Sequence, residues 1–358
     1  MKTMNYFDKL AIQGYYLIAE IGVNYYDIAE KENISLVDAA KLMIKEAKDA
    51  GADAVKFQSY TAKGLAAQDS PSYWDTSEVP LTSQYEFFKL YEKMGRDDYE
   101  ILSKFAEEMD IDFMSTPFDF DAADYLESMM DLYKISSSDL TNHPFVKYIS
   151  RKNMPVILSV GASNAKEIDE TISLIHENNE KKLTILHCVL EYPTPYEHAN
   201  LKRISALSRK YPECIIGYSD HTKPDECMDV IKAAYLLGAK VIEKHFTLDK
   251  GIKGKNDHFH SMDPADLRKI KSGLEFIKSI MGKEEIDCLE TEEAARRNAR
   301  RSIVAEKNIC KGEIITEDKL TFKRPGTGIA PYDLAKVIGK AAKCDIGEDT
   351  ILQYEMIE

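Results

Sequence analysis

The stretch 215–246 reads IIGYSDHTKPDECMDVIKAAYLLGAKVIEKHF. It contains two short apolar runs, the first ending in the polar residues around His221 and the second ending in those around His245. Between them, from Pro224 to Lys240, apolar residues recur at helical spacing and stop near a glycine, which predicts a strand–helix–strand unit. Parallel neighbouring strands present their carboxyl ends at the same edge. We therefore expect the two imidazoles to lie close enough to hold one metal ion.

Runs of the same kind recur through the first three quarters of the chain. The eight runs are Tyr16–Ile21, Ala54–Phe57, Ile111–Met114, Leu132–Ile135, Val156–Val160, Leu183–Leu186, Ile215–Tyr218 and Val241–Glu243. Helical patterns follow most of them, as from Ser35 to Ala50, where a serine N-cap and the terminal Gly51 mark the ends. The pattern predicts a (β/α)₈ TIM barrel, an architecture of about 250 residues. An open doubly wound sheet is the alternative, but no strand is followed by a Gly-x-Gly-x-x-Gly fingerprint.

The chain after the barrel has a different composition. Residues 282–300 are rich in charge and predict a linker, and residues 301–358 combine short alternating runs with glycine turns. They predict a small, mostly β module near the lower size limit for independent stability. We therefore expect it to be stabilised by packing against the barrel or against another chain. The predicted organisation is an N-terminal extension (1–14), a catalytic barrel (15–281), a linker (282–300) and a small domain (301–358). The long connection 59–97 is expected to be an ordered lid or a partner contact.

Composition limits the kinds of partner. The 358 residues carry a net charge of −14, which argues against a general nucleic-acid surface. No signal peptide and no membrane-length apolar run is found, so we expect a soluble cytoplasmic protein. The six cysteines form no CxxC pair, which favours reduced thiols over a disulfide framework or a zinc module.

Polar residues end all eight predicted strands. They are Glu20, Asn24, Lys56, Gln58, Ser115, Thr116, Lys134, Ser136 to Ser138, Ser159, His187, Tyr192, Ser219, His221, Glu243 and His245. Each alone has an ordinary structural explanation, such as a snorkelling lysine or a serine bonded to a backbone carbonyl. Their convergence on the rim where barrel active sites lie favours a single pocket.

The residue types indicate the chemistry of that pocket. Lys56 and Lys134, with several hydroxyls, suit a phosphate or carboxylate. His221 and His245 can hold a divalent cation that polarises a carbonyl oxygen, and Glu20 is then an available base or cation stabiliser. An anion, a carbonyl on a metal and a base together indicate an aldol-like carbon–carbon bond formation.

With these residues in place, the sequence resembles the sialic acid synthase family nearly end to end. The motifs that carry the resemblance are Ala19-Glu20-Ile21-Gly22-Val23-Asn24, Ala52-Asp53-Ala54-Val55-Lys56-Phe57-Gln58, Ser115-Thr116-Pro117-Phe118, Tyr133-Lys134-Ile135, Leu186-His187-Cys188, Tyr192-Pro193-Thr194-Pro195-Tyr196, Gly217-Tyr218-Ser219-Asp220-His221-Thr222 and Glu243-Lys244-His245-Phe246-Thr247. Arg300-Arg301-Ser302 and Lys323-Arg324-Pro325-Gly326 look like the antifreeze-like (SAF) module of that family.

The resemblance implies an activity and roles for residues. The family condenses phosphoenolpyruvate with an N-acylated hexosamine to give a nine-carbon keto acid. The implied metal ligands are His221 and His245, for manganese with magnesium or cobalt as alternatives. The residues implied to hold phosphoenolpyruvate are Lys56, Thr116, Lys134, Ser137, Ser159 and Ser219. Glu20, Gln58, Tyr192 and Asp257 are implied to face the sugar, and Arg324 to reach the acylamino group in a partner subunit's barrel, as in a domain-swapped homodimer.

Two departures bear on the acceptor. Tyr25-Tyr26-Asp27 replaces the family's frequent His-Asn-Gly, and Val189-Leu190-Glu191 replaces a stretch that carries an amide in some members. Both fall where the sugar is expected. The resemblance implies N-acetylmannosamine or a 6-deoxy-diacetamido analogue as the acceptor, and the departures keep legionaminic or pseudaminic acid synthesis as the alternative product assignment.

Two further readings are weaker. A 3-deoxy sugar acid phosphate synthase would share the barrel, but no second basic cluster for an acceptor phosphate is seen and the C-terminal module counts against it. An ice-binding or scaffold protein with an inactive barrel would have lost its lysines or histidines, and none is lost.

Overall fold

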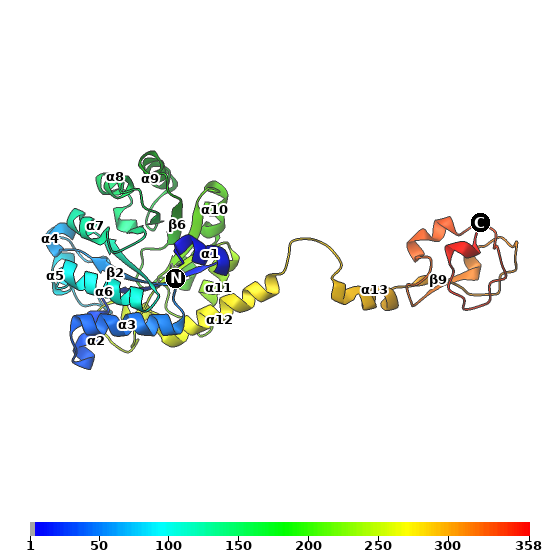
Figure 1. Cartoon of the computed structure of the whole chain (residues 1–358), viewed down its shortest axis with the longest axis horizontal. Coiled ribbons are helices and arrows are strands. Elements are labelled where there is room, and N and C mark those ends of the chain that lie inside the picture. Colours follow the sequence, from blue (N-terminus) through cyan, green and yellow to red (C-terminus); the bar gives the residue numbers. More distant parts are fainter. Residues whose placement is uncertain (1–3) are drawn as a thin grey trace. The chain divides into compact units, whose positions relative to one another are not determined.

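The computed structural model describes residues 4–358, which form two compact units, the first ending at Met281 and the second spanning Gly282–Glu358 (Figure 1). Residues 1–3 of the expected N-terminal extension lie outside the described part. No helix within residues 4–358 is both long and apolar enough to span a bilayer.

The first unit is built on eight parallel strands. They are β1 (Tyr16–Gly22), β2 (Ala54–Ser59), β3 (Asp112–Pro117), β4 (Tyr133–Ile135), β5 (Val156–Ser159), β6 (Leu183–Cys188), β7 (Ile215–Asp220) and β8 (Val241–His245). The order β3-β2-β1-β8-β7-β6-β5-β4 brings the first strand beside the last, and β3 and β4 contact each other at the remaining seam. The predicted (β/α)₈ barrel is therefore confirmed, and each predicted run overlaps a strand, although Ile111, Leu132 and Val160 fall one residue outside theirs.

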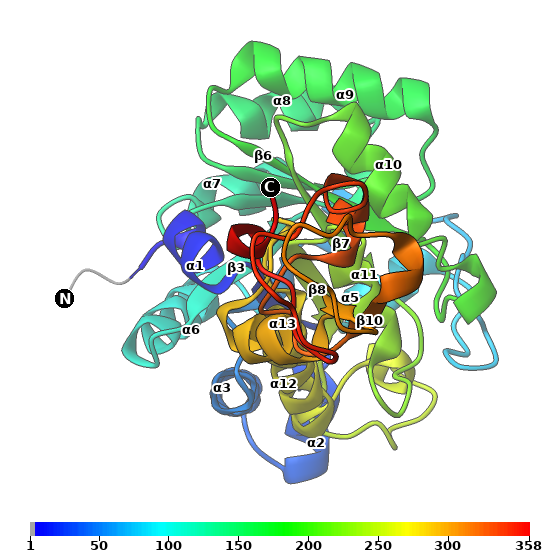
Figure 2. The same cartoon turned by 90° about the vertical axis from the view of Figure 1, so that its right-hand side faces the viewer.

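Helices lie outside the strands, as α3, α8, α9 and α10 show (Figure 1, Figure 2). The helices of this unit are α1 (Tyr6–Gln13), α2 (Tyr25–Glu32), α3 (Leu36–Ala50), α4 (Ala62–Leu65), α5 (Gln84–Leu90), α6 (Arg96–Glu108), α7 (Phe120–Leu126), α8 (His143–Arg151), α9 (Ala165–Asn178), α10 (Lys202–Lys210), α11 (Asp229–Leu236) and α12 (Pro264–Met281), with 3₁₀ turns η1 (Ser137–Asp139), η2 (Tyr196–His198) and η3 (Asp257–His260).

Two of these helices test the sequence reasoning. Helix α3 has the expected ends, since the Ser35 hydroxyl accepts a hydrogen bond from the Asp38 amide and Gly51 is left-handed with φ 102°. The helix expected from Pro224 was placed too early, because α11 begins only at Asp229. The Asp225 carboxylate accepts from backbone amides that follow it, so a capped loop occupies the first part of that segment.

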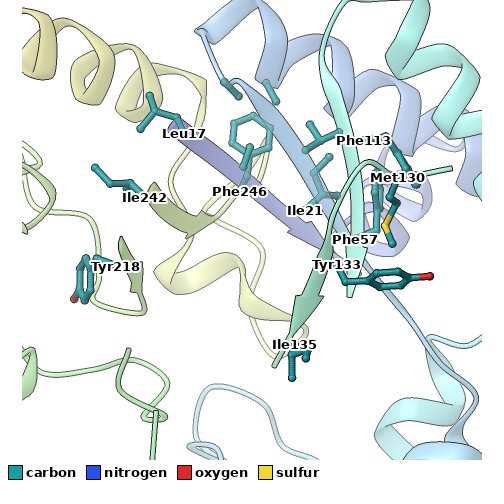
Figure 3. Close-up of a cluster of buried hydrophobic side chains, with 14 of the residues drawn as sticks. Leu17, Ile21, Phe57, Phe113, Met130, Tyr133, Ile135, Tyr218, Ile242 and Phe246 are labelled. Carbon is teal, nitrogen blue, oxygen red and sulfur yellow. The ribbon is translucent and has the colours of Figure 1, made fainter. Parts of the chain in front are cut away.

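Alternation along the strands separates two layers. On β1, Leu17, Ala19 and Ile21 belong to the large core between strands and helices, whereas Tyr16 and Ile18 belong to a smaller core inside the barrel. Figure 3 shows members of the outer layer, among them Leu17, Ile21 and Phe57. Side chains two residues apart share a face, so the residue after Ile18 on the inner face is Glu20. The interior is thus apolar at the floor and polar at the mouth.

Helix α1 packs at the amino-terminal end of the strands. The Tyr6 hydroxyl lies 2.8 Å from the Thr184 hydroxyl, and the Lys9 ammonium lies 2.7 Å from Asp112 Oδ1. Most of the expected extension is therefore an ordered helix attached to the barrel floor.

The long connection 59–97 is ordered over the opposite end. It contains α4 and α5, the Trp74 indole donates to the Leu81 carbonyl at 3.1 Å, and Tyr73 makes an edge contact with Tyr192. Glu78 also lies 3.2 Å from Lys223, which follows β7.

The second unit has its own small core around Ile303, Ile315 and Leu352. Its elements are η4 (Glu290–Glu292), α13 (Glu293–Ala299), β9 (Ser302–Ala305), η5 (Glu317–Lys319), β10 (Leu320–Lys323), η6 (Pro331–Lys336) and η7 (Tyr354–Met356). Strands β9 and β10 pair antiparallel, so its regular sheet has two strands, and apart from α13 the other regular features are isolated bridges and 3₁₀ turns.

Candidate active site

One pocket at the barrel mouth gathers most of the predicted site residues. Its lining includes Glu20, Lys56, Gln58, Thr116, Lys134, Ser136, Ser137, Ser159, Tyr192, Ser219, His221, Glu243 and His245. On the strands these residues share the inward parity of Glu20, which explains why unrelated motifs converge. The register of the strand pairs places Glu20 on β1 beside Lys56 on β2 and beside His245 on β8.

The part of the pocket around Lys56 and Lys134, which we call the lysine side and which includes the carboxylates of Glu20 and Glu243, is densely ion-paired. The buried Lys56 ammonium pairs with Glu20 and lies 3.2 Å from the Thr116 hydroxyl and 3.7 Å from Glu243 Oε2. Lys134 donates to the Ser159 hydroxyl at 2.7 Å and lies 3.9 Å from Glu243 Oε1. The two ammonium groups are thus matched by two carboxylates.

These contacts shift the protonation equilibria in different directions. Burial raises the pKa of Glu20, with Lys56 opposing the rise. Burial acts in the same sense on Glu243, but Lys134 and Lys56 outweigh it and lower the pKa of that carboxyl. Burial lowers the pKa of Lys134. Of the two carboxylates, Glu20 therefore binds a proton more strongly and is the better suited to act as a base.

Hydroxyls complete the lysine side. Ser219 donates to Glu243 Oε1 at 2.9 Å, and the Gly161 amide donates to the Ser137 hydroxyl at 2.8 Å. A Cβ at Gly161 would lie 2.5 Å from Cys188 Sγ and 3.0 Å from Ser137 Oγ, so only glycine lets the backbone approach this closely. Gly161 and Cys188 were missed in the sequence because neither residue type indicates a ligand.

The part around His221, His245 and the turn η3, which we call the histidine side, is built from imidazoles. The His221 and His245 ring centroids are 5.5 Å apart. His221 Nδ1 lies 2.8 Å from the Val189 carbonyl, which sets Nδ1 as the donor and leaves Nε2 with its lone pair. Burial lowers the pKa of His221 to about 4 and that of His245 well below its usual range, so both are neutral and able to bind a metal.

A buried ion pair holds the two histidine strands together from the outside. Lys244 and Asp220 are each 1% exposed and their charged atoms are 2.6 Å apart. Asp220 Oδ1 also accepts from the Tyr218 hydroxyl and from the Thr222 amide. The pair therefore positions the segments that carry His221 and His245 without facing the pocket.

The turn η3 brings further polar groups to this side. Asp257 Oδ2 lies 3.4 Å from His245 Nδ1, and the His260 ring centroid lies 4.8 Å from that of His245. Burial raises the pKa of Asp257 to about 7, with Glu20 adding to the rise. His260 was missed in the sequence, although a third histidine beside Asp257 was a signal that could have found it.

A second hollow adjoins the first and shares Gln58, Tyr192 and His245 with it. The connection 59–97 and η3 supply the rest of its lining, which is Tyr73, Trp74, Val79, Phe87, Phe88, Asp257 and Phe259. None of these lining residues, all within the described chain, is a lysine or arginine. The pocket therefore has a strongly charged end and an aromatic end.

Among the predicted site residues, Arg324 stands apart from this cluster in the chain. It is an exposed residue just after β10 in the second unit. Its role stays a prediction.

The fold and the pocket together define the class of protein. It is a (β/α)₈ barrel followed in the chain by a small β module, and the barrel mouth carries lysines suited to an anion and histidines suited to a metal ion. Residues 43–286 match the NeuB family and residues 300–358 match the SAF domain. The chain belongs to the NeuB family.

Similar proteins agree over nearly the whole length. The chain is 36% identical to an N,N'-diacetyllegionaminic acid synthase of Campylobacter jejuni, covering 94% of this chain and 98% of that protein. It is 30% identical to the human N-acetylneuraminate-9-phosphate synthase, covering 96% and 92%. A spore coat polysaccharide biosynthesis protein E from Chromobacterium violaceum has a similar structure, with TM-score 0.76, 26% identity and coverage of 96% and 99%.

Proposed function

We propose that this protein is a nonulosonic acid synthase that condenses phosphoenolpyruvate, an N-acylated hexosamine and water to a nine-carbon keto acid and phosphate. The observation that carries the proposal is the adjacency at one mouth of two buried lysines and a set of neutral imidazoles, with Glu20 between them. Membership of a family whose named relatives are synthases of this kind supports it.

Phosphoenolpyruvate is assigned to the lysine side. Lys56, Lys134 and the hydroxyls of Thr116, Ser159 and Ser219 offer charge-assisted donors for phosphate and carboxylate oxygens. Ser137 accepts a hydrogen bond from the Gly161 amide and lies 3.0 Å from Cys188 Sγ, so its hydroxyl proton can turn from the thiol to a ligand oxygen.

A divalent cation, with manganese as our first assignment, fits the histidine side. His245 Nδ1 is buried with no hydrogen-bond partner within residues 4–358, as expected for a nitrogen reserved for a ligand. When bound, such an ion supplies Lewis-acid polarisation of a carbonyl oxygen.

The chain's own residues carry the remaining steps. The lysine side orients phosphoenolpyruvate so that its carbon 3 forms the new bond to the aldehyde carbon of the open-chain sugar. Water then adds at carbon 2, and Glu20, whose pKa is raised by burial, takes its proton in this proposal. Cleavage of the bond between carbon 2 and the bridging oxygen then releases phosphate.

The aromatic end of the pocket favours an uncharged acceptor with apolar substituents. Tyr73, Trp74 and Phe259 suit the methyl groups of acetamido and 6-deoxy positions, whereas an acceptor phosphate would require cations. Lys223 lies over the Phe259 ring but is already paired with Glu78. We therefore place the 6-deoxy-diacetamido hexose, and so a legionaminic-type product, ahead of N-acetylmannosamine.

The test is phosphate release from phosphoenolpyruvate with a panel of acceptors. The panel holds N-acetylmannosamine, its 6-phosphate and a 2,4-diacetamido-2,4,6-trideoxyhexose. We expect the last to have the highest kcat/KM, and ¹⁸O placed in the bridging position should leave with phosphate. Label retained in the sugar acid, or no phosphate release with any acceptor, would refute the proposal.

A subunit-mixing experiment tests the proposed homodimer and the proposed role of Arg324. If the partner subunit's Arg324 serves the site that contains Glu20, mixing Glu20→Ala chains with Arg324→Ala chains should restore activity. Failure to recover activity after proven subunit exchange would assign Arg324 to its own chain or to no site.

A further inference from the structure

His260 is a buried histidine that the protein itself leaves without partners. It is 0% exposed, and neither of its ring nitrogens has a hydrogen-bond partner within residues 4–358. A buried polar group without a partner has lost its hydration with nothing in return, so an unpaired imidazole calls for an explanation.

A neighbouring histidine shows that burial on this turn does not by itself cause the lack of partners. His258 is also 0% exposed, yet its Nδ1 lies 2.7 Å from the Thr247 hydroxyl and its Nε2 lies 3.1 Å from Asp27 Oδ2. His258 is therefore a structural residue that holds η3 in place, whereas the lack of partners at His260 needs a different explanation.

The surroundings of His260 are those of a metal ligand. Residues three apart on a 3₁₀ turn eclipse one another, which places Asp257 Oδ1 3.9 Å from His260 Nε2. The other carboxylate oxygen lies 3.4 Å from His245 Nδ1, itself unpaired among the described residues. One ligand atom from each of His245, Asp257 and His260 lies within 4.8 Å of the others.

These separations approach those of a coordination sphere. Ligands bound at about 2.0–2.2 Å stand roughly 3.0–4.3 Å from one another, so the 3.4 and 3.9 Å separations already fit.

We propose that His260 is a further imidazole ligand that completes, with His245 and Asp257, the protein ligand set of the divalent cation. The His221 ring centroid lies 6.2 Å from that of His260, and because His221 Nδ1 donates to the Val189 carbonyl, its Nε2 keeps the lone pair that a metal needs. A set so rich in imidazole favours a transition-series ion such as Mn²⁺ or Co²⁺ over Mg²⁺, which prefers oxygen ligands. The inference rests on the proposed metal site and is independent of the acceptor sugar.

The test compares metal binding by the full-length wild type and His260→Phe. Phenylalanine suits a site walled by Tyr192 and Phe259 but offers no lone pair. We expect Mn²⁺ and Co²⁺ to bind the variant roughly tenfold or more weakly in calorimetric titrations of stripped protein. Pulsed EPR of the Mn²⁺-loaded variant should detect one imidazole nitrogen fewer.

Two controls make the result specific. His176 lies in a second group with Glu213 and Cys214 that could hold a metal, so His176→Ala measures any contribution from that group and should leave the tight site unchanged. The melting temperature of metal-free His260→Phe checks the fold, and His260→Asn provides a second variant if the first does not fold.

Equal affinity and equal nitrogen count in wild type and in both His260 variants would overturn the inference while leaving the synthase proposal intact. A wild type that binds neither ion tightly would overturn the inference and the proposed metal site together. Loss of a nitrogen ligand in a protein that releases no phosphate with any acceptor would support the inference and refute the proposed function.

Discussion

The lysine side and the histidine side of the barrel mouth handle buried polarity in opposite ways. On the lysine side, Lys56 and Lys134 are paired with Glu20 and Glu243, so the charges are balanced within the protein. On the histidine side, His245 Nδ1 and both nitrogens of His260 have no hydrogen-bond partner in the described chain. One side is therefore electrostatically complete before any ligand binds, and the other is complete only with one.

This difference bears on how an anion can bind. Two ammonium groups and two ionised carboxylates sum to zero charge, so the lysine side supplies directed donors but little net attraction for a multiply charged anion. A divalent cation on the histidine side would supply the missing positive charge. The two sides should then act as a unit, with Glu20 in register with both Lys56 and His245.

The largest effect is expected on the histidine side. His245→Ala removes an imidazole from the proposed ligand set, and loss of the polarising ion should lower kcat/KM by several kcal/mol, roughly 10³-fold or more. Phosphate release assayed at saturating Mn²⁺ measures this. Full activity in a chelator-stripped wild type would contradict the view that the histidine side needs a metal ion, because the unpaired imidazoles would then have no metal-dependent role.

The buried ion pair between Lys244 and Asp220, behind the histidines, should affect stability and not the chemistry. Lys244→Met leaves Asp220 buried without its cation, and breaking such a pair costs about 3–5 kcal/mol of stability. Thermal and urea unfolding measure it. Lys45→Met, which removes the exposed pair with Asp49 on α3, is the matched control and should leave the unfolding midpoint unchanged.

The fold could be predicted because its signals are local and repeated. Eight apolar runs and their polar ends mark the strands, and strand alternation fixes that Lys56, Thr116 and Glu243 share the interior. The start of α11 was misjudged because Asp225 caps a loop through side-chain bonds that apolar spacing does not reveal.

The site was less predictable where its chemistry depends on whether a side chain finds a hydrogen-bond partner in a distant part of the chain. A strand-end histidine is visible in the sequence, but whether its nitrogens are bonded depends on contacts distant in the chain, as between His258 and Asp27. The ion-pairing of Lys56 by Glu20 likewise depends on the barrel register. Residue type therefore predicted the chemistry of the mouth, and only the structure separates its two sides.

A substitution on the lysine side should lower activity less than one on the histidine side. Lys134→Ala removes a charge-assisted donor next to Ser159 and should cost on the order of 2–4 kcal/mol in kcat/KM for phosphoenolpyruvate. Initial rates with each substrate varied in turn measure it, and Lys166→Ala, on the exposed face of α9, is the control. A change confined to the apparent affinity for the sugar would assign Lys134 to the wrong ligand.

The smallest effect is the one that joins the two sides. If the bound cation supplies the charge that the balanced lysine side lacks, stripping the metal should weaken phosphoenolpyruvate binding by about 1–3 kcal/mol, and the anion should tighten Mn²⁺ binding by the same factor. Calorimetric titrations of each ligand with and without the other measure both arms. Glu20→Gln sharpens the test, because removing one carboxylate leaves the lysine side with a net positive charge and should reduce the coupling. Equal phosphoenolpyruvate affinity in metal-free and metal-loaded wild type would mean that the two sides bind independently, and the charge balance around Glu20 would then need another explanation.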